Sequence, residues 1–492
     1  MNLIKIINIF FITIILILLP FGFTSYTGNK IYYLIFTLIS SYALLTSFKK
    51  DSISFESFFS LLMWLGFWFK LTVQISFLNS LFPEGVGIFD YRPNSYDQVL
   101  LIASVSIIAF ISARFFRLKF IFNYENLKTI KYNNDHYLGF YSSFRKIIII
   151  SYLILVVFFS ITNLIFIFFQ KGTIPLTILP LGLNNFINWL LMFGLTTFSS
   201  LLIYFEFLYK KKNSNIIVKY GLFETFISSI SVLSRAMIFN GTAIIYGFYR
   251  LIEFDNLKIK KSSFIKYFFI IFILFMMSLL IVSKIRQSKD FPVGHQVHKY
   301  LPTIDIEAKG KGVEKKLAPI IKITNDLTKE FNQIIFLVAG RWVGIEGVMT
   351  VYGNKDLNFS SFITSFNDEF DYSNSFYENT VKRSKHTYKK SPKIFTVYVP
   401  GIVAFLFYTN SLIFLFFGIF LLCIFCSIFE LLAYKISRGN IIFSYVIGNV
   451  LAYRLAHFGY LPQNSYKLML AICMNLIFMY LLFKIIKLFW NK

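Results

Sequence analysis

Five cations lie within or beside long apolar stretches of this sequence, and they are the residues with the clearest chemical potential. Lys70 stands inside an apolar stretch, Arg235 separates two short ones, and Arg454 is close to the end of another. Arg92 precedes an apolar stretch, and Arg341 lies between glycines. A charge is costly in hydrocarbon, so a cation kept there marks a ligand site or a paired position.

Arginine and lysine side chains gathered at one level of a membrane suit a diphosphate on a membrane lipid, because they supply both charge and hydrogen-bond donors. We therefore predict that these five cations bind a lipid pyrophosphate, although each arginine alone could also be an anchor to anionic headgroups. Group transfer from such a lipid needs a base to take the proton of the acceptor hydroxyl. The titratable candidates are Glu346, His295, His298, His457 and Asp90. Of these we select Glu346 and His298 as catalytic.

Two pairs of closely spaced metal-ligand residue types do not predict a metal site. His295 and His298 are three residues apart, but no third ligand follows at a fixed spacing. Cys423 and Cys426 share one helix face without a second pair, which is typical of packing. We expect no metal and no cofactor.

The composition is that of a membrane protein. Hydrophobic residues make up 56% of the 492 residues, 63 residues are Phe, and the mean hydropathy is +0.64. A soluble fold could not bury that much apolar surface. The net charge of +25 could suggest a nucleic-acid partner, but most of the Lys and Arg residues flank apolar stretches and therefore predict cationic membrane-proximal loops instead.

The apolar stretches predict an all-α polytopic membrane protein of about 12 transmembrane helices, with one large extracytoplasmic loop between helices 9 and 10. We place the helices at residues 6–23, 31–48, 57–80, 99–116, 147–169, 189–209, 222–234, 237–249, 264–282, 401–434, 441–458 and 468–489. The positive-inside rule then favours both termini in the cytoplasm. The family resemblance given below implies that the membrane is the inner (cytoplasmic) membrane of a bacterium. Residues 216–254 could hold two spans or one, and the charge distribution favours two joined at Arg235.

Three regions follow from this topology. They are an N-terminal membrane bundle (1–282), a periplasmic loop (283–399) and a C-terminal membrane bundle (400–492). Within the loop, apolar residues recur at helical spacing between Val313 and Val338, which predicts an amphipathic helix. The glycines after it predict an irregular backbone near a ligand, with Arg341 and Glu346 exposed.

Two shorter apolar segments are predicted to differ from plain spans. The segment from Lys171 to Gly182 faces outward and is too broken for a span, so it is either a re-entrant wall of a lipid groove or an interfacial loop packed on its neighbours. The segment 401–434 is long enough for a re-entrant or tilted start before its crossing.

The return of the chain to the membrane carries a resemblance to a known family. The segments Val399-Pro400-Gly401 and Phe407-Tyr408-Thr409-Asn410-Ser411, followed by Gly418, together with the many spans and the large late loop, resemble the O-antigen polymerase (Wzy-type) family. The resemblance implies transfer of a growing glycan from undecaprenyl pyrophosphate to the next lipid-linked repeat unit, without a metal or a nucleotide sugar. It also implies functional periplasmic arginines, for which Arg235 and Arg341 are suited, and a chain-length regulator and a flippase as pathway partners.

Other functions remain open at this stage. An O-antigen ligase would share the architecture and the lipid donor, and a loop histidine such as His298 would then matter most. A class C glycosyltransferase is less favoured, because the loop around residues 26–30 has no acidic residue. A flippase of lipid-linked oligosaccharides would suit the helix number but not the large loop, and no internal repeat is visible. A scaffold protein would need no cation cluster. The polymerase reading predicts that Arg235, Arg341 and Arg454 surround one periplasm-facing cavity.

Overall fold

The computed structural model confirms the membrane-protein class. The structure describes residues 3–78, 80, 82, 85–127, 132–171, 175–210, 216–234, 238–254, 261–287, 339–340, 342–368, 376–382, 399–459, 462 and 465–490. This part of the chain is helical throughout, without a β-strand. Seven of its helical segments are long and apolar enough to cross a membrane.

The long helices coincide with the apolar stretches of the sequence. They are α1 (Leu3–Ser25), α2 (Lys30–Thr46), α5 (Pro93–Phe116), α7 (Asp135–Phe166), α9 (Leu195–Lys210), α11 (Ile238–Phe254), α12 (Lys261–Gln287), α18 (Leu412–Ile436), α19 (Ile441–Ala456) and α20 (Ser465–Phe489). Four helical segments of the described residues contain π-helical turns. The helices α3 (Ser54–Met63), η1 (Trp64–Phe69) and α4 (Lys70–Phe77) are continuous, and α5 continues into η2 (Arg117–Ile121). The turn η4 (Leu190–Gly194) joins α8 (Leu183–Trp189) to α9, and η5 (Ile217–Leu222) continues into α10 (Phe223–Ser231). Large apolar side chains remain exposed along α1, α7 and α18, as expected of helices that face lipid.

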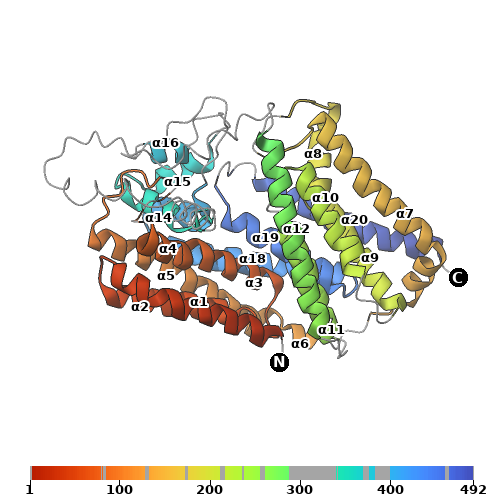
Figure 1. The fold of residues 1–492 in the computed structure, drawn as a ribbon, viewed down its shortest axis with the longest axis horizontal. Coiled ribbons are helices and arrows are strands. Elements are labelled where there is room, and N and C mark those ends of the chain that lie inside the picture. Colours follow the sequence, from red (N-terminus) through yellow and green to blue (C-terminus); the bar gives the residue numbers. More distant parts are fainter. Residues whose placement is uncertain are drawn as a thin grey trace.

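Helix α19 lies at the centre of the bundle. It packs against α3 on one side and α11 on the other, and it also contacts α18, α9 and the short helix α17 (Gly401–Leu406). Figure 1 shows α1 to α5 as one inclined group and α7 to α12 as a second, with α18 and α19 between them. Residues of α19 therefore reach both halves of the molecule.

The region around Arg235 forms two helices rather than one. Ser231, at the end of α10, donates a hydrogen bond to the Ser160 carbonyl of α7, and Asn163 of α7 donates to Ser231. Helix α11 then returns alongside α10, with which it is in contact. The region therefore contains two helices, while the number of membrane spans that they make stays a prediction.

The predicted long helix over 401–434 is interrupted. Helix α17 is followed by a 3₁₀ turn, η8 (Phe407–Thr409), and Asn410 has a φ of +55°. The Ser411 side chain then accepts a hydrogen bond from the Phe414 N–H and caps α18. A short buried helix thus precedes the long one, in agreement with the predicted irregular start.

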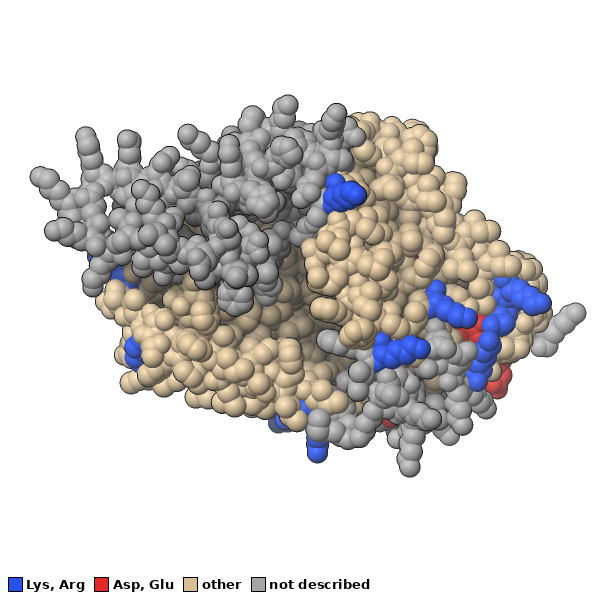
Figure 2. Space-filling model, viewed as in Figure 1, with Lys and Arg blue, Asp and Glu red and all other residues tan. Residues whose placement is uncertain are grey.

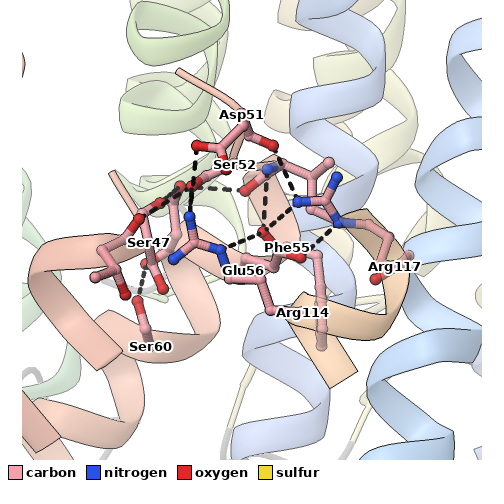
Figure 3. A network of polar contacts seen from close by, with 12 residues as sticks. Ser47, Asp51, Ser52, Phe55, Glu56, Ser60, Arg114 and Arg117 are labelled. Carbon is pink, nitrogen blue, oxygen red and sulfur yellow. Dashed lines mark hydrogen bonds and ion pairs between the residues drawn. The ribbon is translucent and has the colours of Figure 1, made fainter. Parts of the chain in front are cut away.

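One end of the bundle is closed by a dense network of ion pairs, which we call the network end (Figure 3). Arg117 binds the Glu56 carboxylate through two hydrogen bonds of 2.7 and 2.9 Å and donates to the carbonyls of Phe122 and Asp51. Arg114 lies 3.5 Å from Glu56 and 3.6 Å from Asp51. Both guanidinium groups are buried, and their charge is balanced locally.

The network end contains further charged groups that have hydrogen-bond or ion-pair partners. Glu430 of α18 accepts hydrogen bonds from the N–H groups of Ser54 and Phe55, at the start of α3. A carboxylate there is favoured by the free N–H groups and the dipole of the helix. Arg250 pairs with Glu253 at 2.7 Å and also donates to the Lys50 carbonyl. Each of these groups joins helices that are far apart in the sequence.

Part of the predicted periplasmic loop is packed onto the opposite end of the bundle. Its described helices are α14 (Ile345–Gly353), α15 (Phe359–Phe366) and α16 (Phe376–Lys382). Helix α14 is buried against α5, α17 and η1, whereas α15 contacts η8. The predicted amphipathic helix, Val313 to Val338, lies outside the described residues.

Candidate functional site

A small cavity lies at the end of the bundle opposite the network, which we call the cavity end. Its volume is about 30 Å³, and it lies between residues from three elements, η4, α11 and α19, and the segment that follows α7. The lining residues are Lys171, Met192, Phe193, Phe239, Asn240, Asn449, Val450, Tyr453 and Arg454. The helices α11 and α19 contribute most of its wall, because they run side by side to this end.

Two cations, Arg454 and Lys171, line this cavity. Arg454, in the last turn of α19, is largely buried and makes no hydrogen bond or ion pair with any described residue. The Lys171 ammonium lies 5.3 Å from the centre of the Tyr453 ring, a cation–π distance. Burying a guanidinium without a counter-charge is costly, so Arg454 is suited to an anionic ligand.

The polar wall of the cavity is built from two amides. The Asn240 amide donates to the Met192 carbonyl at 3.0 Å and to the Thr196 hydroxyl at 3.3 Å. Asn449 of α19 donates to the Asn240 side-chain oxygen at 3.3 Å. These bonds join α9, α11, η4 and α19 and hold the wall in one arrangement.

His457 follows the last residue of α19 and lies beside the cavity. Its ring stacks on Tyr453 with centres 4.1 Å apart, and Nδ1 is 2.9 Å from the Tyr453 carbonyl oxygen. In the tautomer with hydrogen on Nδ1, the ring donates to that carbonyl and its Nε2 carries a lone pair.

Lys70 and Glu346 form a buried ion pair at the same end. The Lys70 ammonium donates to Glu346 Oε2 at 2.6 Å, to the Trp342 carbonyl at 2.8 Å and to the Gly340 carbonyl at 3.2 Å. Both side chains are almost completely buried. Lys70 thus uses all three of its donors to hold the segment before α14 against α4. The structure gives Lys70 a paired role, one of the two roles that its position predicted, whereas its predicted binding of a pyrophosphate stays a prediction. The predicted exposure of Glu346 is wrong.

Glycines allow this docking because the two backbones nearly touch. A methyl group on Gly344 would lie 2.5 Å from the Gly66 carbonyl oxygen, and one on Gly66 would lie 2.1 Å from the Val343 oxygen. A methyl group on Gly347 would similarly meet the Pro400 oxygen at 2.0 Å. The space beside the glycines that were expected to face a ligand is therefore occupied by other parts of the chain.

The docked segment also touches the cavity wall. The Trp342 ring lies 6.2 Å from the Phe239 ring, which in turn lies 5.9 Å from the Tyr453 ring. These three aromatic rings connect the segment before α14 to the cavity. The ion pair of Lys70 therefore fixes one side of the site without contributing a free charge to it.

The structure brings some of the predicted site residues together and separates others. Arg454 lines the cavity, and Lys70 and Glu346 form the buried ion pair at the same end of the bundle. Arg92 instead has a side chain that is 80% exposed, lies 3.6 Å from Asp90, and does not line the cavity. The predicted residues Arg235, Arg341, His295 and His298 lie outside the described residues.

The sequence reasoning missed three members of the site. Lys171 was treated as part of a broken apolar segment, and Asn240 and Asn449 were not selected. Both asparagines occur inside apolar stretches, where a polar side chain needs a hydrogen-bond partner, so their position could have marked them as site residues. The sequence could not show which partners they have, because those partners are far apart from them in the chain.

This arrangement suits the binding of an anion close to the membrane surface. The Arg454 guanidinium and the Lys171 ammonium can hold phosphate oxygens, and the His457 ring can accept a proton. Among the described residues, no group of three or more His, Cys, Asp or Glu side chains could hold a metal ion. In comparisons with known proteins, no family model, no curated protein and no solved structure matches this chain.

Proposed function

We propose that this protein is a membrane glycosyltransferase that polymerises undecaprenyl-pyrophosphate-linked repeat units in the synthesis of a bacterial surface polysaccharide. The proposal combines the resemblance of the chain to O-antigen polymerases with the charge of the cavity. Its donor is a lipid pyrophosphate and its acceptor is a second lipid-linked unit.

The observation that carries the proposal is Arg454, which has no hydrogen-bond or ion-pair partner among the described residues and lines the cavity with Lys171. At the network end, Arg114, Arg117 and Arg250 all have acidic partners. A cation that is kept in a largely buried position without such a partner is suited to an anion that arrives with a ligand. A diphosphate at the membrane surface fits this position because its lipid chain can remain in the bilayer.

In the proposed reaction, a hydroxyl oxygen of the acceptor sugar attacks the anomeric carbon of the donor. The bond from that carbon to the pyrophosphate oxygen breaks, and the leaving pyrophosphate is stabilised by Arg454 and Lys171. The hydroxyl proton passes to a base. Of the candidates within the described residues, Glu346 is held by Lys70 and Asp90 lies beside Arg92, so we favour His457 over both.

The proposed topology has about twelve spans in the inner membrane, both termini in the cytoplasm and the cavity end facing the periplasm. Support comes from the coincidence of the predicted stretches with helices. It also comes from the distribution of cations, since the loops at the network end contain Lys49, Lys50, Arg438 and the Arg114–Lys146 region. In Figure 2 the described charges on the face shown gather mainly at the lower right, and uncharged residues cover most of the remaining described surface.

Deletion of the gene followed by gel analysis of the surface glycan tests the reaction. A polymerase mutant keeps single repeat units on the surface acceptor. A ligase mutant loses all attached glycan, and a flippase mutant retains the units inside the cell. Only the first pattern agrees with the proposal, and an unchanged glycan contradicts all three functions.

Complementation with variants then tests the site. Arg454→Ala is expected to reproduce the deletion phenotype at normal protein level in the membrane, and Arg454→Lys should restore part of the chain length because it keeps the charge. Lys355→Ala is a matched control, since Lys355 is an exposed cation after α14 that does not line the cavity. Normal glycan with Arg454→Ala would show that the cavity is not the pyrophosphate site.

A further inference from the structure

The connection between α7 and α8 presents large apolar side chains to the outside. The exposed fractions are 76% for Leu176, 86% for Ile178 and 99% for Leu181. This connection lies at the upper edge of the molecule in Figure 1 and is not part of a long helix. A loop that lies in water would not be stabilised by exposing three large apolar side chains so close together in the chain.

The loop is nevertheless firmly built, because side-chain amides satisfy its backbone. Asn184 accepts from the Leu179 N–H at 2.7 Å and donates to the carbonyls of Thr177 and Phe168 at 2.8 and 3.0 Å. The Leu176 N–H donates to the Ile167 carbonyl at 3.1 Å. Non-helical backbone can lie at membrane depth only when its polar groups are satisfied in this way.

Two consecutive residues in the left-handed region turn the tip outward. The φ angles are +56° at Leu181 and +72° at Gly182. A leucine in this conformation is unfavourable, and it persists only where the surrounding structure holds it. Here that conformation keeps the Leu181 side chain almost fully exposed.

The same connection carries one of the two cations of the cavity. Lys171 follows α7 by a few residues, and its backbone N–H donates to the Val232 carbonyl at 2.9 Å. Its side chain lines the cavity with Arg454. One connection therefore supplies a positive charge to the cavity and an apolar tip to the exterior, which matches the two chemically different parts of a phosphate-bearing lipid.

We propose that the loop 175–183 is inserted into the hydrocarbon and contacts the chain of a polyprenyl phosphate lipid whose phosphate binds at Lys171 and Arg454. This inference rests on the proposed function for the class of lipid, and it adds the surface that recognises the lipid chain. Leu176, Ile178 and Leu181 contact the polyprenyl chain, and Asn184 is a positioning residue that fixes the loop.

The test is photo-crosslinking from the tip of the loop. A diazirine probe is attached to Leu181→Cys in a Cys473→Ser background, because Cys423 and Cys426 are buried. The purified full-length protein is placed in phosphatidylcholine vesicles containing a few mole per cent of undecaprenyl phosphate. We expect undecaprenyl phosphate to be captured several-fold above its mole fraction, and Arg454→Ala to remove that enrichment.

Ile147→Cys with the same probe is the matched control, because Ile147 is 62% exposed on α7 but lies in the half of the helix nearer the network end. It should capture the two lipids in proportion to their amounts. Capture in proportion from position 181 as well would overturn the contact with the polyprenyl chain. Capture of water alone at position 181 would overturn insertion of the loop.

A second variant separates the lipid contact from the proposed reaction. Asn184→Ala should reduce enrichment at position 181 without changing capture at position 147, since it removes three hydrogen bonds that shape the loop. Because crosslinking needs no turnover, enrichment combined with normal surface glycan in Arg454→Ala cells would retain the lipid site and reject the polymerase. Absence of enrichment combined with a polymerase phenotype would reject only the loop contact.

Discussion

Buried arginines have different surroundings at the two ends of the bundle. At the network end, Arg117 has a bidentate carboxylate and two backbone carbonyls, and Arg114 lies beside Glu56 and Asp51. At the cavity end, Arg454 has no hydrogen-bond or ion-pair partner among the described residues, although it is largely buried. The same side chain therefore serves to join helices at one end and is available to a ligand at the other.

The two ends differ in how the free-energy cost of burying a guanidinium group is offset. A buried guanidinium that is paired inside the protein contributes to specific packing, whereas an unpaired one lowers stability until an anion binds. Lys70 belongs to the first class although it lies at the cavity end, because Glu346 and two carbonyls surround it. The position of a cation along the membrane normal is thus a weaker guide to its role than its partners.

Breaking the Lys70–Glu346 pair should have the largest effect. Lys70→Met or Glu346→Gln alone is expected to cost about 3–5 kcal/mol, because the remaining charged or polar partner stays buried without its counterpart. The double variant Lys70→Met/Glu346→Gln should recover much of this loss. Thermal unfolding of the purified protein in detergent measures all three, and equal losses in the single and double variants would contradict a coupled pair.

Arg117 and Arg454 should respond in opposite directions to the same substitution. Arg117→Met is expected to lose about 2–3 kcal/mol, since Glu56 keeps only the more distant Arg114 and two carbonyls lose their donor. Arg454→Met should leave the unfolding temperature unchanged or raise it, while it abolishes anion binding. A comparable loss of stability at Arg454 would mean that this arginine is structural, and the contrast between the two ends would fail.

The docking of α14 can be tested at its closest backbone contact. Gly344→Ala should cost about 1–3 kcal/mol, because the added methyl group would lie 2.5 Å from the Gly66 oxygen and the segment would have to shift. Gly139→Ala serves as the control, since its methyl group would meet only the Trp490 indole nitrogen at 3.3 Å. Protease accessibility of the α14 region should rise in the first variant alone.

Sequence reasoning was most successful where local properties decide the outcome. Long apolar stretches predicted the long helices, and the paired helices around Arg235 followed from the distribution of charge. The irregular start of the segment after Pro400 was also predicted, and the structure assigns it to Asn410 and the cap at Ser411. These features depend on composition and on nearby residues, which the sequence contains directly.

The candidate site was predicted only in part. Arg454 was selected because a cation near the end of an apolar stretch is unusual, but Arg92 was selected on the same ground and is exposed beside Asp90. Glu346 was expected to be exposed among glycines, yet those glycines admit Gly66 and Pro400 rather than a ligand. A pattern of residue types does not distinguish a side chain that faces a ligand from one that faces another helix.

By itself, the sequence determined that this chain is a helical membrane protein, because its apolar stretches exceed what a soluble core could bury. It also identified the charged residues whose burial within the membrane costs free energy. Only the tertiary structure decided which of those charges are paired, since Lys70 meets Glu346 across 276 positions of the chain and Arg117 meets Glu56 across 61. Partners so distant in sequence are brought together by helix packing, and within the part of the chain that the structure describes this packing gives Arg454 no partner.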